Sequence, residues 1–348
     1  MRVLISARNA SVGVEAGAIV EAAGRFDLII EAADADLRPG LINAHDHLHR
    51  NHYGRLGHPP YRSAREWAVD IQQRYRGKIA AGRKRPRRSA LLAGAWKNLF
   101  AGVTAVVHHD RWEADFDCGF PLRVVRLTNG DSVQTAGPID TRAAYAIHFA
   151  EGTDAAARAD MVELELRGLL TSNLLAVHAV GVDSTGIDRI RAAGAAVVWC
   201  PTSNMFMLAA TAPEALLASG VDVLIGSDSL LTGAGNLLDE LRFARARGPL
   251  SDAALSRAVG EVAALRLGLA PPSLEVGAPA DLILIRKPVG EACAQDVTMV
   301  MVDGVPRIAS RKLAPQVEKI MPGGRLRTVA GIKRWTNIGG RGVGRKGQ

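Results

Sequence analysis

The stretch Leu41-Ile42-Asn43-Ala44-His45-Asp46-His47 begins as a short apolar run and ends in side chains that bind protons and metal ions. Alternate side chains of a β-strand point to the same face, so His45 and His47 are expected to share one. Imidazole nitrogens suit zinc, iron and similar ions, so this pair could hold a metal. Taken alone the pair is weak evidence, because a histidine-rich turn has the same pattern.

The same pattern of an apolar run closed by polar residues recurs along the middle of the chain, in residues 102–109, 122–128, 144–149, 174–178, 195–200 and 221–228. Helical patterns lie between several of these runs, in residues 63–75, 89–101, 155–170, 186–193 and 212–219. Strands that alternate with helices indicate a parallel sheet, and continuously apolar strands indicate burial on both faces.

Together these runs give seven strands, and residues 132–135 are the weakest candidate for an eighth. Eight parallel strands would close a (β/α)8 TIM barrel, so we predict an α/β protein of this fold. The barrel would occupy residues 39–269, which is slightly compact for such a domain.

The two ends of the chain differ from the middle, because both have short apolar runs with turn residues and no long helical period. We expect residues 1–38 and 270–320 to form one small β-sandwich-like domain beside the barrel. Residues 321–348 are basic, rich in glycine and poor in apolar residues, and we expect this tail to lack order.

The composition excludes several classes of protein. With 48% hydrophobic and 22% charged residues, the chain is not disordered as a whole. The net charge of +8 comes from the end of the chain, where residues 311–348 hold ten Lys or Arg and one acid. The body is therefore nearly neutral, and we expect no body-wide nucleic-acid surface. The basic run at residues 83–88 is interpreted as a solvated approach to a helix.

Neither a signal peptide nor a membrane-spanning segment is apparent in the sequence. Three cysteines are too few and too scattered for a disulfide framework or a cysteine metal cluster. We therefore expect a reduced, cytoplasmic location.

The histidines carry the strongest signal, because all nine lie before residue 179. His148 and His178 each close an apolar run, Asp228 closes another, and Glu151 follows His148 on the next loop. Active-site groups of barrel enzymes lie at the carboxyl ends of the strands. An aspartate there is costly unless it is paired or bound to metal, and a glutamate can move protons near a metal-activated water. A metal at the barrel mouth would explain the whole set.

Residues 39–47 resemble the strand-one signature of the amidohydrolase superfamily. Five further segments resemble, in order along the chain, motifs of the cytosine-deaminase-like branch of this superfamily. That branch includes nucleoside and guanine deaminases and the triazine chlorohydrolases. The segments are residues 148–151, His178, 200–204, 226–229 and 277–282. The resemblance covers about residues 1–308, and the motifs are specific only in combination.

This resemblance implies a role for each matching residue. One divalent ion, zinc in preference to iron, would be held by His45, His47, His148 and Asp228. Asp228 would also take a proton from the water, Glu151 would protonate the ring nitrogen or leaving group, and His178 would polarise the attacked carbon's substituent or steady the hydroxide.

Four further residues are candidates for substrate contact, namely His49, His108, His109 and Asn204. His49 falls on the strand face of His45 and His47, so it also competes as a metal ligand. One of His108 and His109 is expected to face the pocket. Asn204 either contacts substrate or fixes the loop after its strand.

The number of metal ions follows from an absence in the sequence. Many binuclear members of the superfamily bridge two metals with a carboxylated lysine, and this chain has no lysine between Lys97 and Lys287. A mononuclear site is therefore predicted, although a glutamate or cysteine bridge stays open. One metal favours deaminase-type chemistry over dihydroorotase-type chemistry.

We therefore predict a metal-dependent hydrolase of non-peptide C–N bonds that deaminates a small aminated heterocycle. An alternative enzyme would hydrolyse an amide or a C–Cl bond with the same site. An alternative of another class is an inactive scaffold that binds RNA or an acidic partner through its tail. A homodimer is compatible with the sequence but is not indicated by it.

Overall fold

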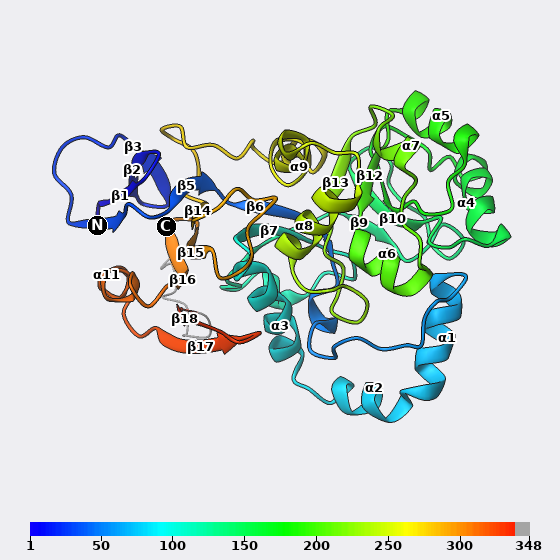
Figure 1. The fold of residues 1–348 in the computed structure, drawn as a ribbon, viewed down its shortest axis with the longest axis horizontal. Helices are drawn as coiled ribbons and strands as arrows, with labels where there is room; N and C mark the ends of the chain where they lie inside the picture. Colours follow the sequence, from blue (N-terminus) through cyan, green and yellow to red (C-terminus); the bar gives the residue numbers. More distant parts are fainter. Residues whose placement is uncertain (338–348) are drawn as a thin grey trace.

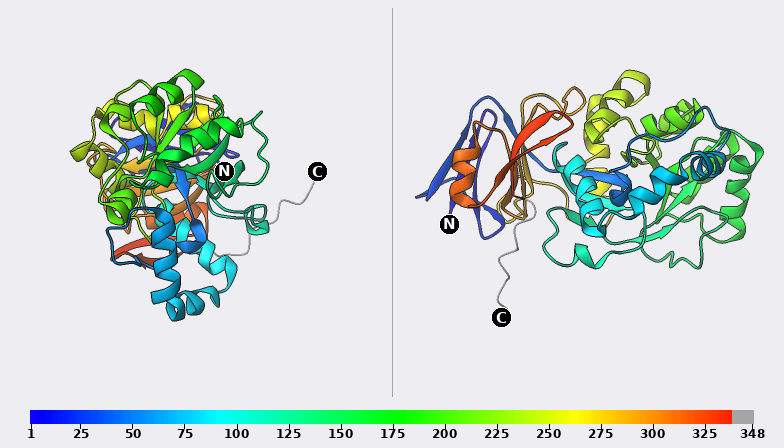
Figure 2. Two further views of the ribbon diagram at one scale, coloured as in Figure 1. Left: turned by 90° about the vertical axis from the view of Figure 1, so that its right-hand side faces the viewer. Right: turned by 90° about the horizontal axis from the view of Figure 1, so that it is seen from below.

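The computed structural model describes residues 1–337 of the chain. Figures 1 and 2 show a β-rich part, which holds the N-terminus, at one end of the molecule and a part built of parallel strands and helices at the other. Among the described residues, none of the helices has the length and apolar character needed to cross a membrane.

The parallel strands form two sheets. One contains β6 (Leu41–Asp46), β7 (Val103–His108) and β8 (Arg123–Val125). The other contains β9 (Thr128–Gly130), β10 (Tyr145–Phe149), β11 (Leu174–His178), β12 (Ala196–Trp199) and β13 (Val223–Ile225). The chain just after β13 reaches the first sheet, because the N–H groups of Ser227 and Asp228 both donate to the His45 carbonyl at 3.0 Å. The α/β class is thus confirmed, while closure into a complete barrel stays a prediction.

The position of the extra strand differs from the sequence-based expectation. The run 122–128 divides into β8 and the start of β9, which pairs in parallel with β10. Residues 132–135 form a turn instead, in which the Ser132 and Thr135 hydroxyls lie 2.7 Å apart and the Thr135 N–H donates to Ser132. Short polar side chains that bond the nearby backbone favour turns over strands, which explains the wrong prediction.

Ten helices of this part alternate with or follow the strands in the chain: α1 (Ala64–Arg74), α2 (Arg76–Arg83), α3 (Arg87–Leu99), α4 (Ala155–Leu166), α5 (Ser184–Ala193), α6 (Pro201–Leu208), α7 (Glu214–Leu217), α8 (Leu237–Arg247), α9 (Asp252–Ala258) and α10 (Glu261–Arg266). Figure 1 shows α2 at the edge of the molecule, away from the strands. Two short 3-10 turns, η1 (Leu48–Arg50) and η2 (Ala114–Phe116), complete it. Side-chain caps define several helix starts, since the Asp154 and Asp183 carboxylates accept from the N–H groups of Ala157 and Gly186.

The buried apolar faces of these elements pack into continuous cores. The residues of β6, β7 and β11 are almost all fully buried, as expected for strands that are covered on both sides. Trp199 at the end of β12 is completely buried, and its indole N–H donates to the Thr211 hydroxyl at 2.6 Å. The strand ends are therefore held on a rigid frame.

The β-rich part combines both ends of the described chain. A four-stranded sheet contains β1 (Val3–Ala7), β2 (Ser11–Glu15), β3 (Ala18–Val20) and β4 (Leu28–Ala32). A six-stranded sheet contains β5 (Asp36–Pro39), β14 (Leu282–Ile285), β15 (Val297–Val302), β16 (Val305–Ala309), β17 (Arg325–Val329) and β18 (Ile332–Thr336), and α11 (Ala314–Ile320) lies between β16 and β17 in the chain. The antiparallel pairing of β5 with β14 joins the two ends directly. The predicted division into domains agrees with this pairing but stays a prediction.

The expectation that residues 321–348 lack order is wrong for their first half. Strands β17 and β18 pair along their whole length, and the Trp335 side chain is packed in the same apolar cluster as Ile5 and Leu37. Its indole N–H donates to Glu318. The average apolar content of the tail is low, and an average does not reveal that one large side chain, Trp335, packs in the core. Residues 338–348, part of the tail invoked for the scaffold alternative, lie outside the described residues.

Replacing Trp335 with alanine tests this packing. Trp335 is 4% exposed, so the Trp335→Ala change should lower the free energy of unfolding by about 3–5 kcal/mol, as for other large-to-small core changes. Chemical denaturation measures the difference. Leu326→Ala on β17, where the side chain is 48% exposed, is the matched control and should cost no more than about 0.5 kcal/mol. Equal, small effects of both changes would contradict the packing of β17 and β18.

Candidate metal centre

Five imidazole rings meet at the carboxyl ends of β6, β7, β10 and β11. The His45 ring lies at their centre, with ring centroids 4.8 to 5.5 Å from those of His47, His109, His148 and His178. His148 keeps some exposure to solvent, while the other four are buried. The structure thus brings together all three histidines predicted as metal ligands.

Asp228 joins this group from the loop after β13. Its Oδ1 lies 3.8 Å from the Nε2 atoms of both His45 and His47. This distance is too long for a hydrogen bond. It suits two atoms that share one ion, because zinc ligands lie about 2.0–2.2 Å from the metal.

Hydrogen bonds orient two of the rings so that Nε2 stays free. The His47 Nδ1–H donates to Asp110 Oδ2 at 2.6 Å, and the His148 Nδ1–H donates to the Asp131 carbonyl at 2.6 Å. A partner on Nδ1 that fixes the tautomer is the usual support of a histidine that ligates metal. Both rings are therefore prepared to offer Nε2 to an ion.

His45 gives the most direct indication of an ion. Its ring is completely buried, and neither of its nitrogens has a hydrogen-bond partner among the described residues. Buried polar atoms are almost always satisfied, so such a ring requires an explanation. Two groups of ligand type share this ring, one with His47 and Asp228 and the other with His148 and His178. A divalent ion bound at His45 supplies the explanation, and the residues present fit such an ion.

The protonation states suit metal binding. Burial lowers the pKa of His45 well below its usual range, and the neighbouring histidines act in the same direction. Burial and the nearby His47 lower the pKa of His148 to about 4. Burial alone would raise the pKa of Asp228. The nearby His47 and His178 and hydrogen bonds from Ser203 and the Ser229 N–H outweigh it, so that the pKa is lowered. Neutral imidazoles and an ionised carboxylate are the forms that bind metal.

His178 is held in a different state from the predicted ligands. The Asn204 amide donates to its Nδ1 at 2.9 Å, which leaves the proton of the neutral ring on Nε2, 3.3 Å from Glu151 Oε1. Burial, together with His148, lowers the pKa of His178 to about 3. His178 therefore presents a donor N–H to the centre, and Asn204 positions that ring.

Glu151 lies beside the cluster with only 14% of its side chain exposed. Burial raises its pKa well above the usual range, and the negative charges of Asp228 and Asp131 raise it further. A carboxyl in this state holds its proton to higher pH than an ordinary glutamate does, which suits a general acid.

His108 and His109 point to different sides of β7. His109 belongs to the cluster, with its ring 4.1 Å from that of His148, and its Nε2–H donates to the Gly130 carbonyl at 2.9 Å. His108 lies away from it, 5.7 Å from the ring of His49. The expectation that one of the two faces the site therefore agrees with the position of His109.

His49 does not share the strand face of His45 and His47, as the sequence suggested. Strand β6 ends at Asp46, and η1 turns the chain immediately afterwards. His49 instead lies beside Asp110, its Nδ1 3.6 Å from Oδ2. His49, His108 and Asp110 form a further group of ligand type, but the Leu48 N–H donates to His108 Nδ1 and leaves the proton on Nε2. That ring has no free nitrogen to offer an ion.

Sequence reasoning missed the buried pair beneath the centre. Lys97, on α3, lies with its Nζ 3.1 Å from Asp46 Oδ2 and also donates to the Asp228 carbonyl. The amides of Asn98 and Asn51 donate to the two oxygens of Asp46 at 2.6 and 2.9 Å. Asp46 therefore ties β6 to α3. A lysine inside an apolar helical pattern was the available signal.

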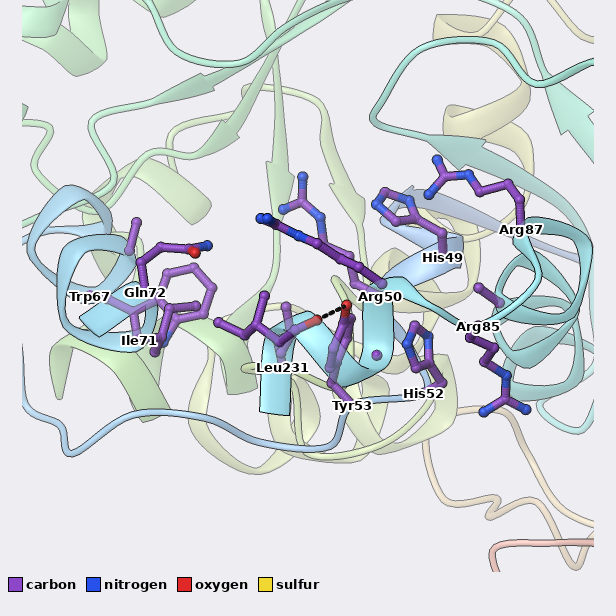
Figure 3. A pocket seen from close by; sticks show the side chains of 15 residues that line it. His49, Arg50, His52, Tyr53, Trp67, Ile71, Gln72, Arg85, Arg87 and Leu231 are labelled. Atoms are coloured by element: carbon purple, nitrogen blue, oxygen red, sulfur yellow. Dashed lines mark hydrogen bonds between the residues drawn. The ribbon is translucent and has the colours of Figure 1, made fainter. Parts of the chain in front are cut away.

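A cavity of about 600 Å³ opens beside the centre, a size that suits a small-molecule ligand. In Figure 3, His49 and Arg87 lie together on one side, Trp67, Ile71 and Gln72 on the other, and Arg50 extends between them. Arg50 Nη2 lies 2.9 Å from Asp110 Oδ1, so the cavity wall contacts the carboxylate that orients His47.

Replacing Lys97 with methionine should destabilise the protein strongly, because Asp46 would stay buried with its charge uncompensated. The Lys97 side chain is 5% exposed and Asp46 is fully buried, so the expected loss is about 3–5 kcal/mol of unfolding free energy. Chemical denaturation measures it. Lys84→Met, at an exposed position after α2, is the control and should have little effect. Equal stability of both variants would show that the pair is not buried.

Comparison with known proteins gives a consistent result. Residues 134–307 match the sequence profile of the amidohydrolase family. The chain is 33% identical over 172 residues to a 5-methylthioadenosine/S-adenosylhomocysteine deaminase of Halobacterium salinarum, covering 42% of this chain and 40% of that protein. It is 39% identical over 84 residues to an aminodeoxyfutalosine deaminase of Deinococcus radiodurans, covering 24% and 20%. These matches thus span less than half the length of each relative.

Solved structures show the same fold. An adenosine deaminase from Xanthomonas campestris with bound zinc has a TM-score of 0.68 and 21% identity, covering 91% of this chain and 96% of that one. An atrazine chlorohydrolase from Arthrobacter aurescens complexed with zinc also has a TM-score of 0.68, with 17% identity and coverage of 92% and 100%. At these identities the likeness concerns the fold alone.

Proposed function

The chain belongs to the amidohydrolase family, and from this premise we propose that it is a metal-dependent hydrolase that removes an amino group from a small heterocycle. The single observation that carries the proposal is the His45 ring. It is buried without hydrogen-bond partners among other candidate ligands, and the neighbouring His178 contacts Glu151, whose pKa is raised by burial. Deaminases among the partial relatives support this reaction over others.

We propose one ion, zinc rather than iron, held by His45, His47, His148 and Asp228. Such an ion would lower the pKa of water from 15.7 to about 7 and so supply a nucleophile at neutral pH. Zinc in two solved structures of the same fold supports the choice of metal. The lack of any lysine between Lys97 and Lys287 supports a single ion.

Asp228 is the proposed base. Its Oδ2 accepts from the hydroxyls of Ser203 and Thr232 at 2.7 and 3.0 Å, which fixes the carboxylate, while Oδ1 faces the histidines. A carboxylate held in this way can take the proton that the attacking water loses.

Glu151 and His178 are the proposed acid and hydrogen-bond donor. Glu151 would pass its proton to the ring nitrogen or to the leaving amine of the substrate. His178, whose proton is on the Nε2 that faces Glu151, would donate to the atom that gains charge at the attacked carbon. Donors fixed before the reaction stabilise such charge without reorganisation.

A second candidate reaction is hydrolysis of an amide or C–Cl bond by the same centre. An atrazine chlorohydrolase with the same fold supports C–Cl hydrolysis as the second candidate. It needs the same activated water, but a leaving group such as chloride needs no proton. The two reactions should therefore depend differently on Glu151.

The Glu151→Gln variant tests the acid. Loss of the proton should lower kcat for ammonia release from aminated purines, pyrimidines or triazines by about 100-fold or more, the usual contribution of general acid–base catalysis. Hydrolysis of a chlorinated analogue should suffer less. Glu31→Gln, at an exposed position on β4, is the control and should keep full activity. If Glu151→Gln retained near-normal deamination, the acid role would be wrong.

Metal removal tests the centre itself. Dialysis against a chelator should abolish ammonia release, and added zinc should restore it in the wild type but not in His148→Ala, since that variant lacks one ligand. Elemental mass spectrometry of the same samples reports the metal content. A chelated, metal-free protein that turned over at the original rate would contradict the proposal.

A further inference from the structure

The cavity beside the metal centre has an unusual charge composition. Its lining contains four arginines, Arg50, Arg83, Arg85 and Arg87, and it contains neither aspartate nor glutamate. The two lining histidines, His49 and His52, add no charge near neutral pH, because burial lowers the pKa of both. Arginines gathered at one cavity without compensating anions attract a negatively charged ligand.

Two of the arginines have no partner of opposite charge. Arg50 is paired with Asp110, and the Nε of Arg87 donates to Glu113 at 2.8 Å. By contrast, within residues 1–337 no carboxylate lies within 4.0 Å of the guanidinium groups of Arg83 and Arg85. The cavity therefore carries a net positive charge that the described protein does not neutralise.

The start of α3 adds to this charge. The helix begins at Arg87, no side chain caps its first turn, and both Arg87 and Ala90 of that turn line the cavity. The free N–H groups of a helix N-terminus carry partial positive charge and bind anions. The uncapped turn thus acts in the same direction as the arginines.

The remaining wall is apolar. Trp67, Ile71, Ile79 and Leu231 line it, and the Trp67 indole N–H is already bonded to the Leu56 carbonyl at 2.8 Å. A ligand that fills the cavity would therefore combine an apolar or aromatic body with an anionic group.

Arg50 connects the cavity to the metal centre. Asp110 accepts from Arg50 through Oδ1 and from His47 through Oδ2, so one carboxylate spans the cavity wall and a proposed metal ligand. The charge of Arg50 also acts on the pKa of Glu151, in the lowering direction. Through Arg50 and Asp110 the cavity wall is therefore linked to a proposed metal ligand and acts electrostatically on Glu151.

We propose that this cavity is a specificity site for an anionic group, a carboxylate or phosphate on an apolar arm, carried by the substrate remote from the amino group that is removed. The inference rests on the proposed function for the identity of the ligand as substrate. Residues 83–88 are exposed, in agreement with a solvated approach to α3, and the proposal adds that Arg83, Arg85 and Arg87 of this run line the cavity.

Binding of phenyl phosphate, an aromatic body with one phosphate, tests the site without any need for turnover. Isothermal titration calorimetry on the zinc-loaded protein should show binding of phenyl phosphate and not of neutral phenol. The double change Arg83→Gln/Arg85→Gln should weaken binding by roughly 10-fold or more, because charge-assisted hydrogen bonds are lost. Both side chains are exposed, so the variant should fold.

Two matched variants complete the experiment. Arg76→Gln removes an exposed arginine of α2 that does not line the cavity, and it should bind as the wild type does. His148→Ala weakens the metal centre, and it should retain phenyl phosphate binding if the phosphate sits in the cavity. Wild-type affinity in the double variant, loss of binding only in His148→Ala, or equal binding of phenol would each overturn the proposal.

The outcome is separable from that of the proposed function. If the protein bound phenyl phosphate but deaminated no heterocycle, the anion site would be supported and the proposed deaminase function would be wrong. If the protein deaminated a heterocycle but did not bind phenyl phosphate, the anion site would be wrong and the proposed deaminase function would be supported.

Discussion

The site depends on one constraint, which is that imidazole rings can share a space nearly free of water only if they are uncharged. His45 has four other histidine rings around it and no hydrogen-bond partner of its own. Burial lowers the pKa of His45, His109, His148 and His178, so each of these rings is uncharged near neutral pH and has one nitrogen with a free lone pair. A divalent cation is the group that satisfies several lone pairs at one point, and Asp228 supplies matching negative charge.

The rest of the architecture serves to hold these groups in place. Asp110 and the Asp131 carbonyl fix the tautomers of His47 and His148, and Asn204 gives His178 the opposite tautomer. Below them the buried Lys97–Asp46 pair joins α3 to the end of β6. The hydrogen bonds thus give these histidines different roles: His47 and His148 offer a free Nε2 to an ion, whereas His178 presents an N–H donor.

Part of this could be predicted from the sequence and part could not. In parallel sheets the carboxyl ends of strands meet at one edge, so His45, His148, His178 and Asp228 could be placed together from their position after apolar runs. The partners of Lys97 and Asp110 depend on contacts between distant elements, which local patterns do not encode. The face of His49 was wrong because η1 begins one residue after His47, and strand periodicity says nothing about where a strand ends.

Anomalous diffraction from crystals of the zinc-loaded protein, recorded on both sides of the zinc absorption edge, tests the central claim most directly. We expect one strong anomalous peak within bonding distance of His45, His47, His148 and Asp228, with His178 and Glu151 near it but not bound. A loaded crystal with no peak between these four side chains, or with its only peak elsewhere, would show that they do not hold the ion.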